Sequence, residues 1–313
     1  MRVLVTGGAG FIGGNLTADL TARGAVVGVI DDLSTGSETN LPEGAWFRRL
    51  DILDPGLEVA VSEFAPEVVV HLAAQADVQA SIADPDRDRA VNVEGTRAVG
   101  AAASAVGASR VVSASSAAVY GDPVSVPLPE TARKAPANPY GRSKLAAETA
   151  LAEALAGTAT DHASFRFSNV YGPRQDWRGE GGVVAIFAGR LRGGEPVVIF
   201  GDGTQTRDFI YVGDVVSALE AAAIAPETLA AAGPDGSAYN ISTGRETTVS
   251  EIAATLGTLA GTTSGPVHRP AREGDIGRSA LDPSKARAVF GWAASRPLDE
   301  GLAETWRWFR EVS

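Results

Sequence analysis

Residues 3–13 read VLVTGGAGFIG, and this stretch decides the fold. Residues 3–5 are apolar and predict a buried strand, and the glycines that follow have the spacing G-x-x-G-x-x-G. Gly7 permits a tight turn, Gly10 lets the backbone approach a pyrophosphate, and Gly13 lets the next helix pack against the sheet. The N-terminus of that helix offers unpaired N–H groups to phosphates. The stretch therefore predicts the first strand, turn and helix of a dinucleotide-binding fold.

Short apolar runs alternate with amphipathic stretches through the first 120 residues. Strands are expected at 2–6, 26–31, 46–50, 68–72 and 110–114, and helices at about 12–23, 56–64, 87–106 and 139–156. Val68, Val69 and Val70 form a continuous apolar run, as in a strand buried on both faces of a parallel sheet. The alternation predicts an α/β fold with a doubly wound parallel sheet of the Rossmann type.

The pattern loosens after about residue 165. We expect a Rossmann domain over residues 1–165, to which the chain returns around 205–243, and a smaller C-terminal α/β substrate domain over 166–313. Later elements are expected as a helix at 182–191, a strand at 197–200, a helix that Asp214 caps and that runs to about Ile224, and an amphipathic helix carrying Leu302, Trp306 and Phe309.

Composition excludes several classes of protein. The net charge of −11 argues against nucleic acid or an anionic membrane surface as the main partner. The 313 residues include no cysteine, and the three histidines lack metal-ligand spacing, so neither a disulfide nor a metal site is expected. His71 ends an apolar run and is interpreted as a structural histidine. No apolar stretch suggests a membrane span or signal peptide, so a cytoplasmic protein is the default expectation.

Asp31 ends the second expected strand and predicts which dinucleotide binds. A carboxylate there accepts hydrogen bonds from the adenosine ribose and repels a 2′-phosphate. Asp32 adds a second negative charge, and no arginine stands immediately beside the pair, which favours NAD over NADP. Further candidate cofactor residues follow later strands: Asp51 and Ile52, for which ordinary loop roles stay open, and Leu72, Ala73 and Ala74.

Tyr140 is followed four residues later by Lys144, one of only three lysines in the chain. Positions i and i+4 share a helix face, so the ammonium is expected to favour the phenolate and lower a pKa that starts near 10. Such a tyrosine can take a proton from a hydroxyl group at neutral pH. Ser116, in the Ser115–Ser116 pair at a strand end, can hydrogen-bond the same oxygen. The trio suits oxidation of a secondary alcohol.

With these residues together, the chain resembles the extended short-chain dehydrogenase/reductase superfamily and, within it, the UDP-glucose (UDP-galactose) 4-epimerases. The resemblance covers essentially the whole length. The matching stretches are TGGAGFIG at 6–13, DDLSTG at 31–36, HLAAQADV at 71–78, NVEGT at 92–96, SSAAVYGDP at 115–123, PYGRSK at 139–144, FSNVYGPRQ at 167–175, FGDGTQTRDFIYVGDV at 200–215 and REGD at 272–275. Jointly they are specific for nucleotide-sugar-modifying members, and less so for 4-epimerases.

The resemblance implies a role for each matching residue. Tyr140 would be the base, Lys144 would bind the nicotinamide ribose and tune Tyr140, and Ser116 would bridge to the sugar 4-hydroxyl. The implied NAD site comprises Gly7, Gly10, Phe11, Ile12, Asp31, Asp32, Ser34, Thr35, Gly36, Asp51, Ile52, Leu72, Ala73, Ala74, Gln75, Asn92, Ala114, Tyr140, Lys144 and Phe167. The implied UDP-sugar site comprises Ser116, Tyr140, Asn169, Val183, Arg207, Arg272, Asp275 and Ser279.

Arg207 and Arg272 fit a diphosphate, because its oxygens need cationic donors in fork geometry. A role in a surface salt bridge stays open as the other interpretation of each arginine. Related 4,6-dehydratases carry an Asp-Glu pair directly after the active-site Ser or Thr, where this chain has Ala117 and Ala118. Without a carboxyl group there is no obvious acid or base for eliminating water. The resemblance therefore implies an NAD-dependent isomerase that epimerises UDP-glucose and UDP-galactose through a 4-keto intermediate, as a homodimer built from helices near 90–106 and 139–156.

Three alternatives stay open. Ser279 is small where a bulky residue is associated with excluding N-acetyl sugars, so UDP-N-acetylhexosamines are candidate substrates, and a plain loop serine is the other interpretation. A UDP-glucuronate 4-epimerase or nucleotide-sugar reductase would use the same scaffold, with Arg174, Arg178 or Arg190 as candidate contacts for a carboxylated sugar. A non-catalytic, dinucleotide-sensing protein is the third, although such proteins often lose the Tyr or the Lys.

Overall fold

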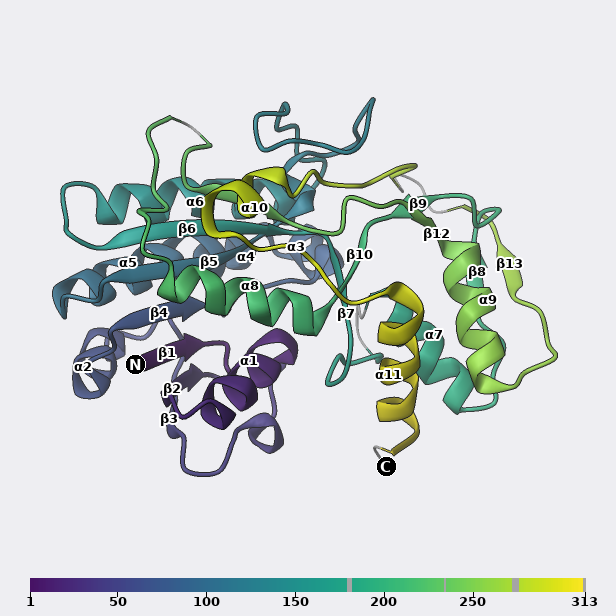
Figure 1. The fold of residues 1–313 in the computed structure, drawn as a ribbon, viewed down its shortest axis with the longest axis horizontal. Coiled ribbons are helices and arrows are strands. Elements are labelled where there is room, and N and C mark those ends of the chain that lie inside the picture. The colour runs from purple at the N-terminus through teal and green to yellow at the C-terminus, as the bar shows by residue number, and fades with distance from the viewer. Residues whose placement is uncertain (179–181, 234, 272–275, 312–313) are drawn as a thin grey trace.

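The structure, a computed structural model, describes residues 1–178, 182–233, 235–271 and 276–311. Across these residues the central sheet has seven strands in the order β11-β6-β5-β4-β1-β2-β3, and all its pairings are parallel (Figure 1). The strands are β1 (Arg2–Thr6), β2 (Val26–Asp31), β3 (Trp46–Arg49), β4 (Val68–His71), β5 (Arg110–Ser116), β6 (Asp161–Phe167) and β11 (Ala238–Ile241). The order reverses between β1 and β4, which confirms the doubly wound sheet.

Helices cover both faces of this sheet. They are α1 (Phe11–Ala22), α2 (Leu57–Phe64), α5 (Gly95–Ala105), α6 (Pro139–Leu155), α8 (Val212–Ile224) and α10 (Ser284–Phe290). The short helices α3 (Val78–Ala83) and α4 (Pro85–Arg89) pack against α6. Successive side chains of a strand point to opposite faces. Val3 and Val5 accordingly pack with α1 and α8, whereas Leu4 packs with α2 and α5. This two-sided burial explains why β1 is apolar at every interior position.

A second apolar cluster lies to one side of the sheet and is built mainly from the later part of the chain (Figure 1). It is built mainly from β7 (Asn169–Tyr171), α7 (Val183–Arg192), β8 (Val198–Phe200), β10 (Phe209–Tyr211), α9 (Val249–Ala260) and α11 (Leu298–Glu311). The short strands β9 (Thr206–Arg207), β12 (Thr247–Thr248) and β13 (Val267–Arg269) lie in the same part of the chain and pair outside the central sheet. Leu302, Trp306 and Phe309 are buried on α11, as predicted. The division at residue 165 stays a prediction.

The expected helix over 87–106 is interrupted. The chain forms α4, then a π-helical segment at Ala90–Glu94, then α5. Asn92 lies in the π-helical segment, and its side chain pairs with both the N–H and the C=O of Gln75. Single π-helical turns inside α-helices are frequent at functional sites, and hydrophobic periodicity does not reveal them. No helix in the described part of the chain is both long and apolar enough to cross a bilayer.

Candidate active site

The glycine-rich turn joins β1 to α1 in a space that side chains would fill. Gly7 has a φ of +71°, and a Cβ on it would lie 2.5 Å from the backbone nitrogen of Ala73. A Cβ on Gly13 would lie 2.1 Å from the Gly7 carbonyl oxygen. Gly10 precedes the first turn of α1 and provides no side-chain cap. The N–H groups of that turn are thus left to a ligand, and the cradle fits a pyrophosphate.

Asp31 is fixed beside this turn. Its carboxylate accepts hydrogen bonds of 2.9 Å from the backbone N–H groups of Ala9 and Leu33. Burial raises the pKa of Asp31, an effect that these two hydrogen bonds oppose. The following loop folds back on the turn, because the Ser37 N–H donates to the Ala9 carbonyl at 3.0 Å. A carboxylate in this position can also accept hydrogen bonds from ribose hydroxyls, so Asp31 fits NAD as the bound dinucleotide.

The other predicted cofactor residues lie at or just beyond the carboxyl ends of the strands. Leu72, Ala73, Ala74 and Gln75 follow β4, and Phe167 ends β6 with its side chain in the core. Asp51 pairs with Arg87 at 3.0 Å. Ile52 is buried against Gly95, so its side chain belongs to the core. Phe11 and Ile12 open α1, and Asp32, Ser34, Thr35 and Gly36 end or follow β2.

The predicted catalytic trio comes from β5 and α6. Ser116 is the last residue of β5, and Tyr140 and Lys144 lie in the first two turns of α6. The helix begins where the Asn138 side chain accepts the Gly141 N–H at 2.8 Å, and the residue after Asn138 is a proline. The buried Lys144 ammonium donates to the Ala114 carbonyl at 2.9 Å. One strand end therefore supplies both the serine and the carbonyl that orients the lysine.

The electrostatics of Tyr140 differ from the sequence-based expectation. Burial raises the pKa of the Tyr140 phenol, the Ser116 side chain lowers it, and the Asp88 charge raises it again. Burial likewise lowers the pKa of Lys144 to about 8, although the charges of Asp88 and Glu148 oppose this. The Tyr140 pKa is thus raised and not lowered as expected, and Lys144 is not among the groups that shift it.

Sequence reasoning missed a buried charge network behind the trio. Glu148 accepts from Ser115 Oγ at 2.5 Å and from the guanidinium of Arg166 at 2.6 Å. Arg166 is fully buried and also pairs with Asp235 at 2.9 Å. Glu148 lies four residues after Lys144 and eight after Tyr140, on the same face of the helix. Extending the four-residue spacing by one step along the sequence could therefore have identified Glu148. The network fixes Ser115, the neighbour of Ser116.

Besides Ser116 and Tyr140, the predicted substrate residues lie in the later part of the chain. Arg207 on β9 donates to the carbonyls of Thr206 and Ile276 at 2.8 and 2.7 Å. Asn169 and Val183 begin β7 and α7, and Ser279 is half-buried. The structure thus places these residues but shows no contact that tests their predicted role. Arg272 and Asp275 lie outside the described residues.

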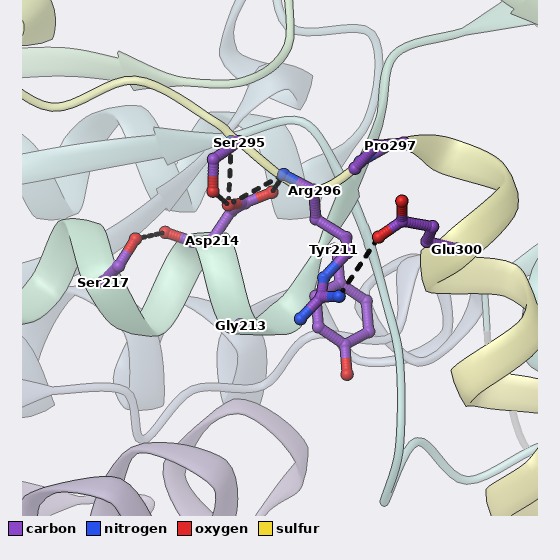
Figure 2. A pocket seen from close by; sticks show the side chains of 8 residues that line it. All are labelled: Tyr211, Gly213, Asp214, Ser217, Ser295, Arg296, Pro297 and Glu300. Atoms are coloured by element: carbon purple, nitrogen blue, oxygen red, sulfur yellow. Dashed lines mark hydrogen bonds and ion pairs between the residues drawn. The ribbon is translucent and has the colours of Figure 1, made fainter.

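A cavity of about 370 Å³ lies where α8 meets the segment entering α11, and no catalytic residue lines it (Figure 2). The Asp214 carboxylate points into this junction and accepts from the N–H and Oγ of Ser295 and from the Arg296 N–H. The prediction that Asp214 caps α8 is wrong, since the helix begins two residues earlier, at Val212. The Asp214 carboxylate instead joins α8 to the segment that enters α11, through Ser295 and Arg296. The cavity between these two elements is lined mainly by polar residues.

Comparison with known proteins agrees with this geometry. Residues 3–242 match the model of the NAD dependent epimerase/dehydratase family. A UDP-glucose 4-epimerase of Mycolicibacterium smegmatis is 42% identical to this chain, and the match covers 100% of both sequences. A Thermotoga maritima UDP-glucose 4-epimerase solved with UDP-glucose superposes with a TM-score of 0.93 at 40% identity, covering 99% of both chains. The Thermus thermophilus UDP-glucose 4-epimerase solved with NAD superposes with a TM-score of 0.91 at 40% identity, and the match covers 100% of both chains.

The chain belongs to the NAD dependent epimerase/dehydratase family, in the extended short-chain dehydrogenase/reductase superfamily. Its full-length relatives place it, within that family, in the UDP-glucose 4-epimerase family, which confirms the resemblance seen in its motifs. It is therefore an enzyme of the epimerase class that uses NAD. A relative of related specificity, a UDP-N-acetylglucosamine 4-epimerase of Methanobrevibacter ruminantium, superposes with a TM-score of 0.91 at 30% identity, covering 98% of this chain and 97% of that one.

Proposed function

We propose that this protein is an NAD-dependent 4-epimerase that interconverts UDP-glucose and UDP-galactose. The observation that carries the proposal is the convergence of Ser116, Tyr140 and Lys144 at the carboxyl end of β5, beside the glycine-rich turn of a parallel sheet. Ligands of doubly wound sheets bind at this edge, where the strand order reverses. Three of the relatives named above are UDP-glucose 4-epimerases. The alternative of a non-catalytic binding protein is disfavoured because the whole trio is present.

In the proposed mechanism the chain moves one proton and holds two ligands. The Tyr140 oxygen takes the proton of the sugar 4-hydroxyl group. The Ser116 hydroxyl forms hydrogen bonds with both the Tyr140 oxygen and the sugar O4. The Lys144 ammonium, oriented by the Ala114 carbonyl, donates to the nicotinamide ribose. NAD supplies, when bound, the acceptor and later the donor of the C4 hydride. Tyr140 returns the proton after the 4-keto sugar has turned, which inverts C4.

The residues after Ser116 limit the chemistry to this exchange. Ala117 and Ala118 form a short 3₁₀ turn, and the Ser116 hydroxyl accepts the Ala118 N–H at 3.1 Å. Methyl groups at these positions can neither donate nor accept a proton, so the chain offers no acid or base here for eliminating water from the sugar. This favours an epimerase over a dehydratase.

Product analysis tests the proposal. Purified protein, without added cofactor, is incubated separately with UDP-glucose, UDP-N-acetylglucosamine and UDP-glucuronate, and the products are identified by NMR. We expect UDP-galactose from UDP-glucose, and a loss of at least about 1,000-fold in kcat for Tyr140→Phe, since the proton acceptor is removed. Full activity of that variant, or conversion of UDP-glucuronate alone, would contradict the assignment. An absolute need for added NADH, with its net consumption, would contradict it as well.

The proposal includes a cytoplasmic homodimer. The support is that α5 and α6 pack side by side and that small residues, such as Ala101, Ala146 and Ala154, occupy partly or fully exposed positions on them. Small side chains allow helices of two subunits to approach closely. Sedimentation velocity of the purified protein checks the oligomeric state, and cell fractionation checks the location. A monomer at micromolar concentration would remove the dimer from the proposal.

A further inference from the structure

The predicted trio depends on how the end of β5 is held against α6, since Ser116 comes from the strand and Tyr140 and Lys144 come from the helix. Lys144 provides one link between these elements, through the Ala114 carbonyl. In the proposed mechanism the same ammonium also binds the nicotinamide ribose. A second link lies one turn further along α6, and the mechanism above does not use it.

The second link joins Ser115 to Glu148. The Ser115 hydroxyl donates to Glu148 Oε1 at 2.5 Å, and only 5% of Ser115 is exposed. Glu148 lies on the helix face that carries Tyr140 and Lys144. A hydroxyl group that donates to a carboxylate forms a charge-assisted hydrogen bond, which is stronger than one between neutral groups. The link therefore holds the residue next to Ser116 against the helix that carries Tyr140.

Arg166 fixes the orientation of this link. It lies on β6 as the register partner of Ser115, so both side chains project from the same face of the sheet. The fully buried guanidinium holds both oxygens of Glu148, from Nε at 2.9 Å and from Nη2 at 2.6 Å. A bidentate pair of this kind adds geometric specificity as well as energy. Glu148 therefore meets Ser115 in a fixed orientation.

The same guanidinium also holds the segment that connects β5 to α6 along the chain. Its Nη1 donates to the Tyr120 hydroxyl and to the Glu130 carbonyl, both at 3.0 Å. Its Nη2 donates to Asp235 as well, at 2.9 Å. All five N–H groups of Arg166 are thus engaged. The strand end, the helix and the connecting segment therefore meet at one buried cation.

We propose that Ser115 is a positioning residue: held by Glu148 and Arg166, it fixes the end of β5 relative to α6 and thereby the separation of the Ser116 hydroxyl and the Tyr140 phenol. Proton transfer requires both oxygens within hydrogen-bond reach of the same sugar hydroxyl group, so a shift of the strand end slows the chemical step. Binding of NAD and of the UDP moiety depends on other residues and should change little. This role rests on the proposed function of the trio.

The test compares two serines that project from the same face of β5. Ser115→Ala removes the hydroxyl that reaches α6, and kcat for UDP-glucose should fall by about tenfold, less than the roughly 100-fold that a displacement of 1 Å can cause. KM for UDP-glucose and NAD affinity should stay close to their wild-type values. Ser113→Ala is the matched control and should keep the wild-type kcat. Ser113 is 4% exposed, and its hydroxyl bonds within the sheet, with Ser164 Oγ at 3.1 Å.

A second readout does not depend on epimerase activity. Hydrogen–deuterium exchange of the ligand-free protein over residues 114–120 should be faster in Ser115→Ala than in the wild type, and unchanged in Ser113→Ala. In this segment the Ala118 N–H donates to Ser116 Oγ at 3.1 Å, a bond that opens more often when the strand end is released. If the wild type epimerises no UDP-sugar, the proposed function fails, while this exchange still decides whether Ser115 fixes the strand end.

Thermal melting establishes that both variants fold, and Ser115→Cys, whose thiol is a weak donor, replaces Ser115→Ala if that variant does not. Equal kcat values and equal exchange in the Ser115 and Ser113 variants would overturn the proposal and leave Ser115 a purely structural residue. A raised KM or a loss of NAD affinity at unchanged kcat would overturn it as well, because the strand end would then act on binding.

Discussion

Gly13→Ala is expected to loosen the cofactor cradle by an amount that the structure specifies. The added Cβ would lie 2.1 Å from the Gly7 carbonyl oxygen and 2.7 Å from the Gly8 Cα, whereas such contacts are essentially never shorter than 3.0 Å. The oxygen contact alone requires the turn and α1 to separate by 0.9 Å, the difference between 3.0 and 2.1 Å. Overpacking of this kind costs about 1–3 kcal/mol of stability.

The same displacement moves the N–H groups at the start of α1 away from the phosphates. A misplacement of about 1 Å can cost roughly 100-fold, so NAD affinity should fall by about that factor. Isothermal titration with NAD and urea unfolding measure the two effects. Gly257→Ala is the matched control, because its Cβ would meet only Thr262 Cγ2, at 3.4 Å, and alanine is favoured in the α9 helix by up to about 1 kcal/mol. Unchanged NAD affinity and an unchanged unfolding midpoint in Gly13→Ala would refute the reasoning.

Three further predictions concern stability and specificity. Arg166→Met leaves Glu148 and Asp235 without their buried partner and should cost about 3–5 kcal/mol in urea unfolding; a loss below about 1 kcal/mol would contradict this. Burial, followed by the neighbouring Asp19, raises the pKa of Glu220 from 4.5 to about 7. The folded state therefore loses stability as pH rises from 4.5 through about 7, because Glu220 must then ionise while buried. Glu220→Gln should raise the melting temperature at about pH 8 but not at about pH 4. Ser279→Tyr should reduce the rate on UDP-N-acetylgalactosamine far more than on UDP-galactose, and equal effects on both rates would discard a sugar-pocket role for Ser279.

Local sequence signals predicted the Rossmann sheet because each of them is decided by neighbouring residues. The apolar run of β1, the glycine spacing after it and Pro139 at the first position of α6 all act within a few positions. The elements they predict are present with boundaries shifted by only a residue or two. Asp214 shows where such signals fail. Its position suggested a helix cap, but its partners are Ser295 and Arg296, far along the chain, and only folding brings them together.

The sequence by itself determined the family, the sheet and the identity of the candidate catalytic trio, since these depend on residue type and short spacing. The tertiary structure decided the electrostatics of that trio. Burial raises the Tyr140 pKa, and the Ala114 carbonyl accepts a hydrogen bond from the Lys144 ammonium. These effects depend on distance and on exclusion of water, which arise only when segments remote in sequence pack against one another.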